Sequence, residues 1–231
     1  MAEQGLVSSR SQAESYVRLG QVKVNGRVAE KAGQLVSAAD TITLSVQEQY
    51  VSRAALKLQS AAAAFNLDFK DKTVLDVGSS TGGFTQYALT KGAAKVIAVD
   101  VGTDQLHPSL RRDPRIELHE KMDIRDYVPT EHIDVVVGDV SFISLRDILP
   151  HVADIVDARA DIVAMVKPQF EAQQSSLKHK GVIKNDSMRR QILRDFESWA
   201  QAHFRIIQKA DSEVPGSKGN VERFYLLRKL G

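Results

Sequence analysis

Cysteine is absent from this chain of 231 residues, and tryptophan occurs once. The absence of cysteine excludes a disulfide framework, a thiolate zinc site and a cysteine nucleophile, and it is typical of proteins of the reducing cytosol. No apolar run approaches the roughly 20 residues that a membrane-spanning helix needs, and the first 20 residues lack the apolar core of a signal peptide. We therefore expect a cytoplasmic protein that does not act in a membrane.

A large excess of charge of one sign is also missing. The 31 Lys and Arg residues nearly balance 29 Asp and Glu residues, for a formal net charge of +2, which excludes a histone-like polycation and an acidic disordered tail. Residues 1–60 contain seven basic and five acidic residues, so the whole excess lies there. With 43% hydrophobic residues, the chain is long enough for one sizeable core and a small appendage.

The N-terminal part has the pattern of a small folded unit. An amphipathic stretch that follows a cap at Ser8-Ser9 and ends at Gly20 predicts a helix. Asn25-Gly26 stands between alternating apolar residues, which is the strongest short-range signal for a tight hairpin. Residues 41–44 predict another strand, and the polar segment 45–50 marks the boundary to the next domain.

After this boundary, helix-like and strand-like segments alternate. We expect helices at 53–65, 84–91, 145–156 and 187–202, and strands at 73–76, 95–100, 133–139, 161–167 and 223–228. Such alternation predicts a parallel sheet with helices on its faces. The expected fold class is therefore α/β, a doubly wound Rossmann-like sheet over residues 52–231, preceded by a small α+β unit over residues 1–46.

The first expected strand of this sheet runs through Asp76 into a glycine-rich turn, residues 78–83, and then into a helix. Glycines let the backbone approach a ligand closely, and the helix presents free N–H groups. The spacing is neither that of a dinucleotide fingerprint nor that of a phosphate-binding P-loop. Because a carboxylate beside the turn repels phosphate and attracts an ammonium group, the pattern favours a nucleoside that carries an amino acid.

Two further carboxylates extend this pattern. Asp100 ends the next strand, where such folds bind ribose hydroxyls, and Asp123 could meet an adenine edge. Together these features predict a site for S-adenosylmethionine, although an ordinary strand-to-helix turn with helix-capping aspartates would look similar residue by residue. The residues predicted to bind the cofactor are Asp76, Gly78, Ser79, Gly82, Gly83, Phe84, Asp100 and Asp123.

A second constellation consists of Lys57, Asp139, Lys167 and Glu222. Asp139 and Lys167 end two expected strands, and the carboxyl ends of strands form the ligand crevice of an open α/β sheet. A lysine held among carboxylates and beside a second ammonium group is a plausible general base for an alcohol. The alternative is that Lys57 and Glu222 are solvated surface charges.

Several segments carry a family resemblance that covers essentially the whole chain. They are Ser52–Leu58, Leu75–Thr85, Gly138–Leu145, Val166–Glu171 and Gly216–Glu222. In these segments the chain resembles the TlyA (hemolysin A) family of rRNA 2′-O-methyltransferases, whose catalytic domain is similar to FtsJ-type ribose methyltransferases. The resemblance implies methyl transfer from S-adenosylmethionine to a ribose 2′-hydroxyl of ribosomal RNA, with cytidine as the nucleoside.

The same resemblance assigns the family's Lys-Asp-Lys-Glu tetrad to Lys57, Asp139, Lys167 and Glu222. We expect Lys167 to take the hydroxyl proton, with Asp139 and Glu222 holding it. Lys57 would orient the hydroxyl. The methyl group is already activated by a positive sulfur, so the protein mainly has to align the attack.

The N-terminal unit resembles the alpha-L RNA-binding domain first named in a small-subunit ribosomal protein. The residues that match its binding surface include Arg10, Arg18, Lys23, Asn25 and Arg27. The family usually has a longer segment ahead of the first helix, so we expect a shortened N-terminal domain. A solvated hairpin domain without RNA affinity is the alternative on charge alone.

A third basic region runs from residue 178 to residue 194 and suits phosphate contact, but a solvated helix face would have the same composition. The six histidines show no paired ligand spacing, so we expect no metal site. The expected partners are ribosomal RNA and ribosomal subunits, without a membrane. The target nucleotide, the subunit and the oligomeric state are left open.

Three rival functions are compatible with parts of the sequence. A pore-forming hemolysin needs a spanning helix or barrel strands with an apolar outer band, and the sequence offers neither. A nicotinamide-dependent oxidoreductase is disfavoured by the glycine spacing. A non-enzymatic rRNA-binding or ribosome assembly factor is the stronger alternative, but binding alone would not need two lysines converging with two carboxylates.

Overall fold

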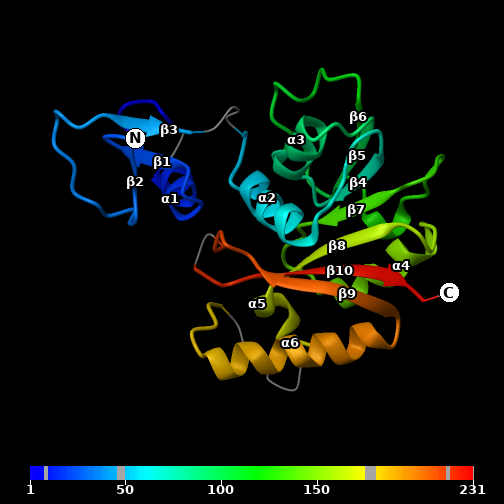
Figure 1. Cartoon of the computed structure of the whole chain (residues 1–231). Helices are drawn as coiled ribbons and strands as arrows, with labels where there is room; N and C mark the ends of the chain where they lie inside the picture. The colour runs from blue at the N-terminus through cyan, green and yellow to red at the C-terminus, as the bar shows by residue number, and fades with distance from the viewer. Residues whose placement is uncertain (8–9, 46–49, 175–180, 217–218, 231) are drawn as a thin grey trace.

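The computed structural model describes residues 1–7, 10–45, 50–174, 181–216 and 219–230, and it consists of two units (Figure 1). The N-terminal unit contains helix α1 (Arg10–Arg18) and strands β1 (Val22–Val24), β2 (Arg27–Val28) and β3 (Ile42–Leu44). The strands form an antiparallel sheet in the order β2-β1-β3. Asn25 and Gly26 have φ values of 51° and 78°, which confirms the predicted tight hairpin. The serine cap predicted at residues 8 and 9 lies outside the described residues.

The larger unit is built on a seven-stranded sheet in the order β6-β5-β4-β7-β8-β10-β9. Its strands are β4 (Thr73–Val77), β5 (Lys95–Asp100), β6 (Ile116–Glu120), β7 (Val135–Gly138), β8 (Asp161–Val166), β9 (Phe204–Asp211) and β10 (Arg223–Lys229). Strands β4 to β8 are parallel to one another, whereas β10 is antiparallel to both β8 and β9. The mixed α/β fold predicted from the sequence is confirmed.

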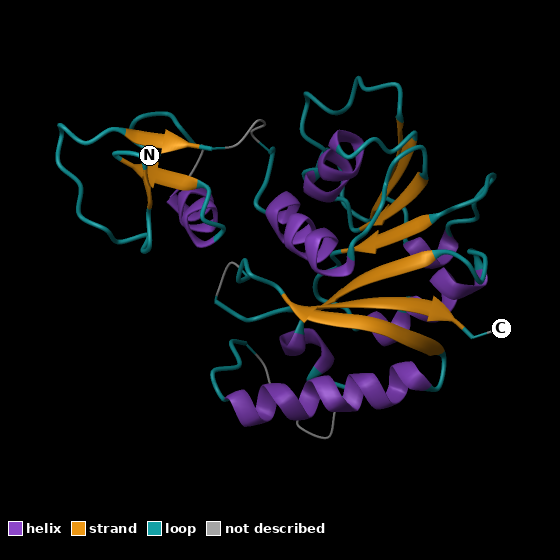
Figure 2. Ribbon diagram, viewed as in Figure 1, coloured by secondary structure: helices purple, strands orange, loops and turns teal. Residues whose placement is uncertain are grey.

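Helices cover both faces of this sheet (Figure 2). They are α2 (Ala54–Phe65), α3 (Gly83–Thr90), α4 (Leu149–Asp154), α5 (Pro168–Glu171) and α6 (Asp186–Gln201), with short 3-10 turns η1 (Ile124–Asp126) and η2 (Leu145–Asp147). Neighbouring strand residues face opposite sides, so Val74 packs with α2 and α3 while Leu75 packs with α4 and α6. The central strands are buried on both faces, which explains why they read as continuous apolar runs.

The structure differs from the sequence prediction at three places. The helix predicted at 145–156 is divided into η2 and α4, because Pro150 has no N–H and its ring clashes with the carbonyl of Arg146 in a continuous helix. The predicted parallel sheet is confirmed for β4 to β8 but not for β10, which runs antiparallel to β8. Strands β6 and β9 were not predicted, and most of β9 is an exposed or half-exposed edge with polar residues.

The two units share one apolar cluster. Tyr16 and Val22 of the N-terminal unit pack with Leu56 of α2 and Val214, which lies between β9 and β10. The Gln12 amide also donates a hydrogen bond to the carbonyl of Tyr50 (3.1 Å). The N-terminal unit is therefore seated on the same helix that bears Lys57.

Candidate active site

The carboxyl ends of β4 and β7 meet at the topological switch point of the sheet. From β4 the chain builds outward through β5 and β6, and it then returns to β7 on the other side of β4. Ligands of open α/β sheets bind outside the carboxyl ends of the strands at such a point. Gly78 turns here with a φ of 80°, and a Cβ at this position would lie 3.0 Å from the carbonyl oxygen of Asp139. Glycine is thus required both by conformation and by space.

Asp76 is fully buried below this turn, and only one of its two carboxylate oxygens accepts a hydrogen bond from a described residue. Its Oδ2 accepts a hydrogen bond from the Thr85 hydroxyl (2.6 Å), whereas Oδ1 is buried and has no hydrogen-bond partner among the residues that the structure describes. Burial raises the pKa of Asp76 to about 7, and the charges of Asp139 and Asp100 add to this effect. Within the described part of the chain, the hydroxyl of Ser79 is likewise buried without a hydrogen-bond partner. A positively charged donor placed here would satisfy the free carboxylate oxygen.

A cavity of about 420 Å³ lies beside this turn, and Val77, Gly78 and Ser80, the neighbours of the buried Asp76 and Ser79, line it. Asp100 borders it with both carboxylate oxygens anchored, because Oδ2 accepts from the backbone N–H of Ser80 (2.8 Å) and Oδ1 from that of Gly102 (2.7 Å). Asp123 borders it too, but its carboxylate pairs with the Arg125 guanidinium (2.6 Å), which lowers the pKa of Asp123 to about 2. Asp100 is therefore fixed in orientation, and Asp123 is held ionised.

The remaining predicted cofactor residues, Gly82, Gly83 and Phe84, are not among the residues that line this cavity. A Cβ on Gly82 would meet Leu106 and Leu110, and one on Gly83 would meet Ser52. The Phe84 ring is buried 6.3 Å from that of Phe224 in the core. These three residues shape the turn and seat α3 against α2, and their direct contact with a cofactor stays a prediction.

The carboxylates at and near this cavity nonetheless fit a cofactor such as S-adenosylmethionine. The free oxygen of Asp76 suits an ammonium group, and the anchored carboxylate of Asp100 suits a pair of ribose hydroxyls. The close approach of Gly78 to the Asp139 backbone leaves no space for a side chain at the turn, and Gly78 itself lines the cavity.

The predicted catalytic residues form two ion pairs beside this cavity. Lys57 Nζ lies 2.5 Å from Glu222 Oε2, and Lys167 Nζ lies 2.5 Å from Asp139 Oδ1. Both lysines and Glu222 are buried. Because β10 is antiparallel to β8, its first residue, Arg223, lies beside Val166, and Glu222 reaches the same edge as Lys167.

Three of the four, namely Lys57, Lys167 and Glu222, line a second cavity of about 600 Å³, and Asp139 lines the first. Ser141 and Phe142 line both cavities, so the two spaces adjoin at these residues. The arrangement can hold a cofactor on one side and a second reactant on the other, with the Lys167–Asp139 pair between them.

Sequence reasoning missed several residues of the second cavity. Phe142 is 92% exposed, and its backbone has a φ of 68°. The centroid of its ring lies 5.3 Å from that of the Phe170 ring. Arg53, at the start of α2, lines the same cavity. The signal that could have found Phe142 is its place three residues after Asp139, in a turn that follows a buried strand.

The predicted RNA-binding residues are grouped on the N-terminal unit. Arg10 and Arg18 lie on α1 and pair with Glu3 (3.5 Å) and Glu14 (2.9 Å), both at exposed positions. Lys23 lies on β1, and Arg27 is exposed on β2. The Asn25 amide instead bonds within the unit, to Asp40 (2.7 Å) and to the backbone of Thr41 (2.8 Å), so it fixes the hairpin.

In the third basic region, residues 178–180 lie outside the described residues. Arg189 pairs with Asp211 (2.6 Å) and donates to the carbonyl of Val221 (2.9 Å), which gives it a structural role. Among the residues that the structure describes, no group of three or more metal-ligating side chains is present. None of the described helices is long and apolar enough to cross a membrane.

Comparisons with known proteins agree with this geometry. Residues 50–229 match the family model of the FtsJ-like methyltransferase, and residues 1–42 match that of the S4 domain. The 16S/23S rRNA (cytidine-2′-O)-methyltransferase TlyA of Mycobacterium tuberculosis is 38% identical over 234 residues, covering 99% of this chain and 87% of the relative.

Two further known proteins are similar to this chain over most of its length. The 23S rRNA (cytidine-2′-O)-methyltransferase TlyA of Campylobacter jejuni is 41% identical over 182 residues, covering 78% of this chain and 71% of the relative. A solved structure of a protein named as a hemolysin, from Streptococcus thermophilus, has a TM-score of 0.73 at 38% identity, covering 98% of this chain and 85% of that chain.

Proposed function

Because this chain belongs to the FtsJ-like methyltransferase family, we propose that it methylates the 2′-hydroxyl of a cytidine in ribosomal RNA with S-adenosylmethionine. The observation that carries the proposal is the pair of lysine–carboxylate contacts beside a cavity that Gly78 and Asp100 line, next to the buried Asp76. The relatives named as rRNA (cytidine-2′-O)-methyltransferases support the choice of substrate.

The first cavity is the proposed cofactor site. Asp76 binds the ammonium group, Asp100 binds the ribose hydroxyls, and the backbone at Gly78 borders the amino-acid moiety. When bound, S-adenosylmethionine supplies a methyl group that its positive sulfur has already activated. The protein therefore has to hold the reactants in line and to remove one proton.

The second cavity is the proposed nucleoside site. Lys167 in its neutral form accepts the proton of the 2′-hydroxyl, and Asp139 stabilises the ammonium that results. Lys57, held by Glu222, donates to the ribose and fixes its orientation. The exposed Phe142 ring, supported by Phe170, provides a surface on which the target base can stack.

The N-terminal unit is the proposed RNA-binding domain, with its boundary to the methyltransferase domain between residues 46 and 52. The match to the S4 domain supports this assignment, as do the exposed Arg10, Arg18 and Arg27. Such cations contact phosphates and give affinity without reading sequence. The substrate is thus held by one domain while the other performs the transfer.

The test is transfer of labelled methyl from S-adenosylmethionine to ribosomes and separated subunits from a strain that lacks this protein. We expect label in rRNA, and we expect Lys167→Ala to abolish it while the dissociation constant of the cofactor stays within about twofold. Full activity of Lys167→Ala would refute the assignment of the base. Cofactor binding and correct folding without any label would favour the assembly-factor alternative.

A further inference from the structure

Ser141 contributes the directional contact to the amine of Lys167. Lys167 Nζ donates a hydrogen bond to Ser141 Oγ (2.8 Å), and within the described part of the chain this is the one hydrogen bond that the amine makes. Asp139 Oδ1 lies 2.5 Å from the same amine as an ion-pair contact. Asp139 supplies the opposite charge, and Ser141 adds a neutral acceptor as a second point of contact.

The direction matters because a neutral amine has two N–H groups and one lone pair. With one N–H on Ser141 and the other beside the carboxylate of Asp139, the lone pair is left for the third direction. Lys167 lines the second cavity, where a ribose hydroxyl would lie. Without the Ser141 acceptor, the amine could rotate about its last bond and the lone pair would lose this orientation.

The Glu171 side chain holds the end of the turn that contains Ser141. This buried carboxylate accepts hydrogen bonds from the Ser144 hydroxyl (2.7 Å) and from the backbone N–H of Leu145 (2.7 Å). Glu171 lies in α5, which begins directly after Lys167, so it ties the segment of Lys167 to the turn of Ser141. Phe142 keeps a left-handed backbone in this turn, and such strain persists where the surroundings determine it.

We propose that Ser141 is a positioning residue that orients the Lys167 amine toward the target 2′-hydroxyl. The inference rests on the proposed function. In the step, the O–H bond of the ribose breaks and the proton forms an N–H bond on Lys167. The oxygen forms a bond to the methyl carbon as the carbon–sulfur bond breaks. Ser141 accepts a hydrogen bond throughout and neither gains nor loses a proton.

The decisive variants are Ser141→Ala, which removes the acceptor, and Ser141→Thr, which keeps it. Ser141 is exposed, so neither change creates a cavity in the core. The matched control is Ser60→Ala, which removes a half-buried hydroxyl that bonds to the carbonyl of Lys57 (2.8 Å) and lines neither cavity. Single-turnover rate, KM for the rRNA substrate and cofactor dissociation constant are measured for each.

We expect Ser141→Ala to lower the single-turnover rate about 10- to 100-fold, with KM and the cofactor dissociation constant within about twofold. Ser141→Thr should recover most of the rate, and Ser60→Ala should match the unchanged protein. An unaltered rate in Ser141→Ala would overturn the proposal. So would a loss that threonine does not restore, or a parallel rise in the cofactor dissociation constant, since Ser141 also lines that cavity.

A second measurement separates this inference from the proposed function. In protein labelled with ¹⁵N-lysine, the Lys167 Nζ signal is assigned by its absence in Lys167→Ala. We expect its hydrogen exchange to become faster and its motion larger in Ser141→Ala, but not in Ser60→Ala. If no RNA is methylated, the proposed function fails, and the signal still decides whether Ser141 orients the amine: an unchanged signal overturns it.

Discussion

At the scale of single residues, Asp76 makes the free protein sensitive to pH. Its pKa is raised by burial to about 7, so the folded state keeps a proton that the unfolded chain, with a pKa near 3.9, has lost. Protonated Asp76 contributes its full stabilisation to the folded state below about pH 4. As pH rises through about 7, this contribution is lost, and the free energy of unfolding falls by up to about 4 kcal/mol. The ammonium group of a bound cofactor would offset this loss because it pairs with the ionised form.

Cofactor affinity should accordingly rise with pH. Between pH 5.5 and 7 the ionised fraction of Asp76 increases more than tenfold, so we expect the dissociation constant of S-adenosylmethionine to fall about tenfold, measured by calorimetry. Asp76→Asn should weaken binding at pH 7 about 10- to 100-fold and flatten the profile.

The control for this change is Asp134→Asn. The Asp134 carboxylate accepts a hydrogen bond from the backbone N–H of Thr73 at the amino ends of β4 and β7, away from the carboxyl ends where the cavity lies. The control variant should leave the cofactor affinity and its pH dependence unchanged. A flat profile in the unaltered protein would contradict the assignment of Asp76 to the ammonium group.

At the scale of elements, the connections before and after α3 each contain a glycine, but they require it for different reasons. Gly78 and Gly92 both have a left-handed backbone, with φ values of 80° and 89°. A Cβ on Gly78 would press on the carbonyl of Asp139 at 3.0 Å, but one on Gly92 would meet Lys70 at an ordinary 3.5 Å. The two positions therefore share the conformational strain and differ in the space around them.

We expect Gly78→Ala and Gly92→Ala each to lower the free energy of unfolding by about 1–2 kcal/mol, because alanine in the left-handed region is strained. Only Gly78→Ala should also weaken S-adenosylmethionine binding, since it displaces the Asp139 backbone at the cofactor cavity. Denaturant unfolding and calorimetry provide the two readouts. Equal loss of cofactor affinity in both variants would show that strain alone matters.

At the scale of the whole molecule, the N-terminal unit packs against the two segments that carry Lys57 and Glu222. Leu56, next to Lys57, packs against Tyr16, and Val214 lies in the same connection between β9 and β10 as Glu222. RNA bound by the N-terminal unit, as proposed above, would lie close to the two segments that form the Lys57–Glu222 pair. In the proposed function, this placement lets a separate domain present a nucleoside to the second cavity.

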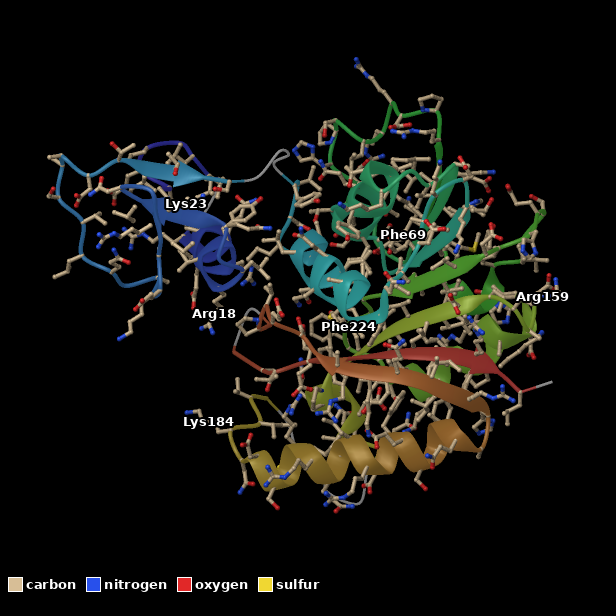
Figure 3. The ribbon with its side chains drawn as sticks, in the orientation of Figure 1. Arg18, Lys23, Phe69, Arg159, Lys184 and Phe224 are labelled. Atoms are coloured by element: carbon tan, nitrogen blue, oxygen red, sulfur yellow. The ribbon has the colours of Figure 1, made fainter. Side chains whose placement is uncertain are left out.

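Charge reversal tests this arrangement. Arg18 and Lys23 lie on the N-terminal unit, far from Arg159 at the opposite end of the molecule (Figure 3). The double variant Arg18→Glu with Lys23→Glu should raise KM for rRNA at least tenfold and reduce its salt dependence, because phosphate contacts are lost. The cofactor dissociation constant should not change. Arg159→Glu, which alters an exposed arginine, is the control and should leave both constants unaltered.

The sequence could predict whatever depends on local pattern. The Asn25-Gly26 hairpin follows from backbone preference, and the apolar runs at β4, β5, β7 and β8 follow from burial on both faces. The glycine turn with Asp76 before it indicated a nucleoside site, because the residue types limit which ligands are compatible. Family resemblance then identified the four charged residues as one set.

Only the tertiary structure decided how those residues meet. The antiparallel course of β10 brings Glu222 to Lys57, and the return of the chain to β7 brings Asp139 to Gly78. The free oxygen of Asp76 and the hydrogen bond from Lys167 to Ser141 are likewise properties of packing. Sequence patterns report short-range preferences, whereas strand order, pairing direction and burial arise from contacts between residues that are distant along the chain.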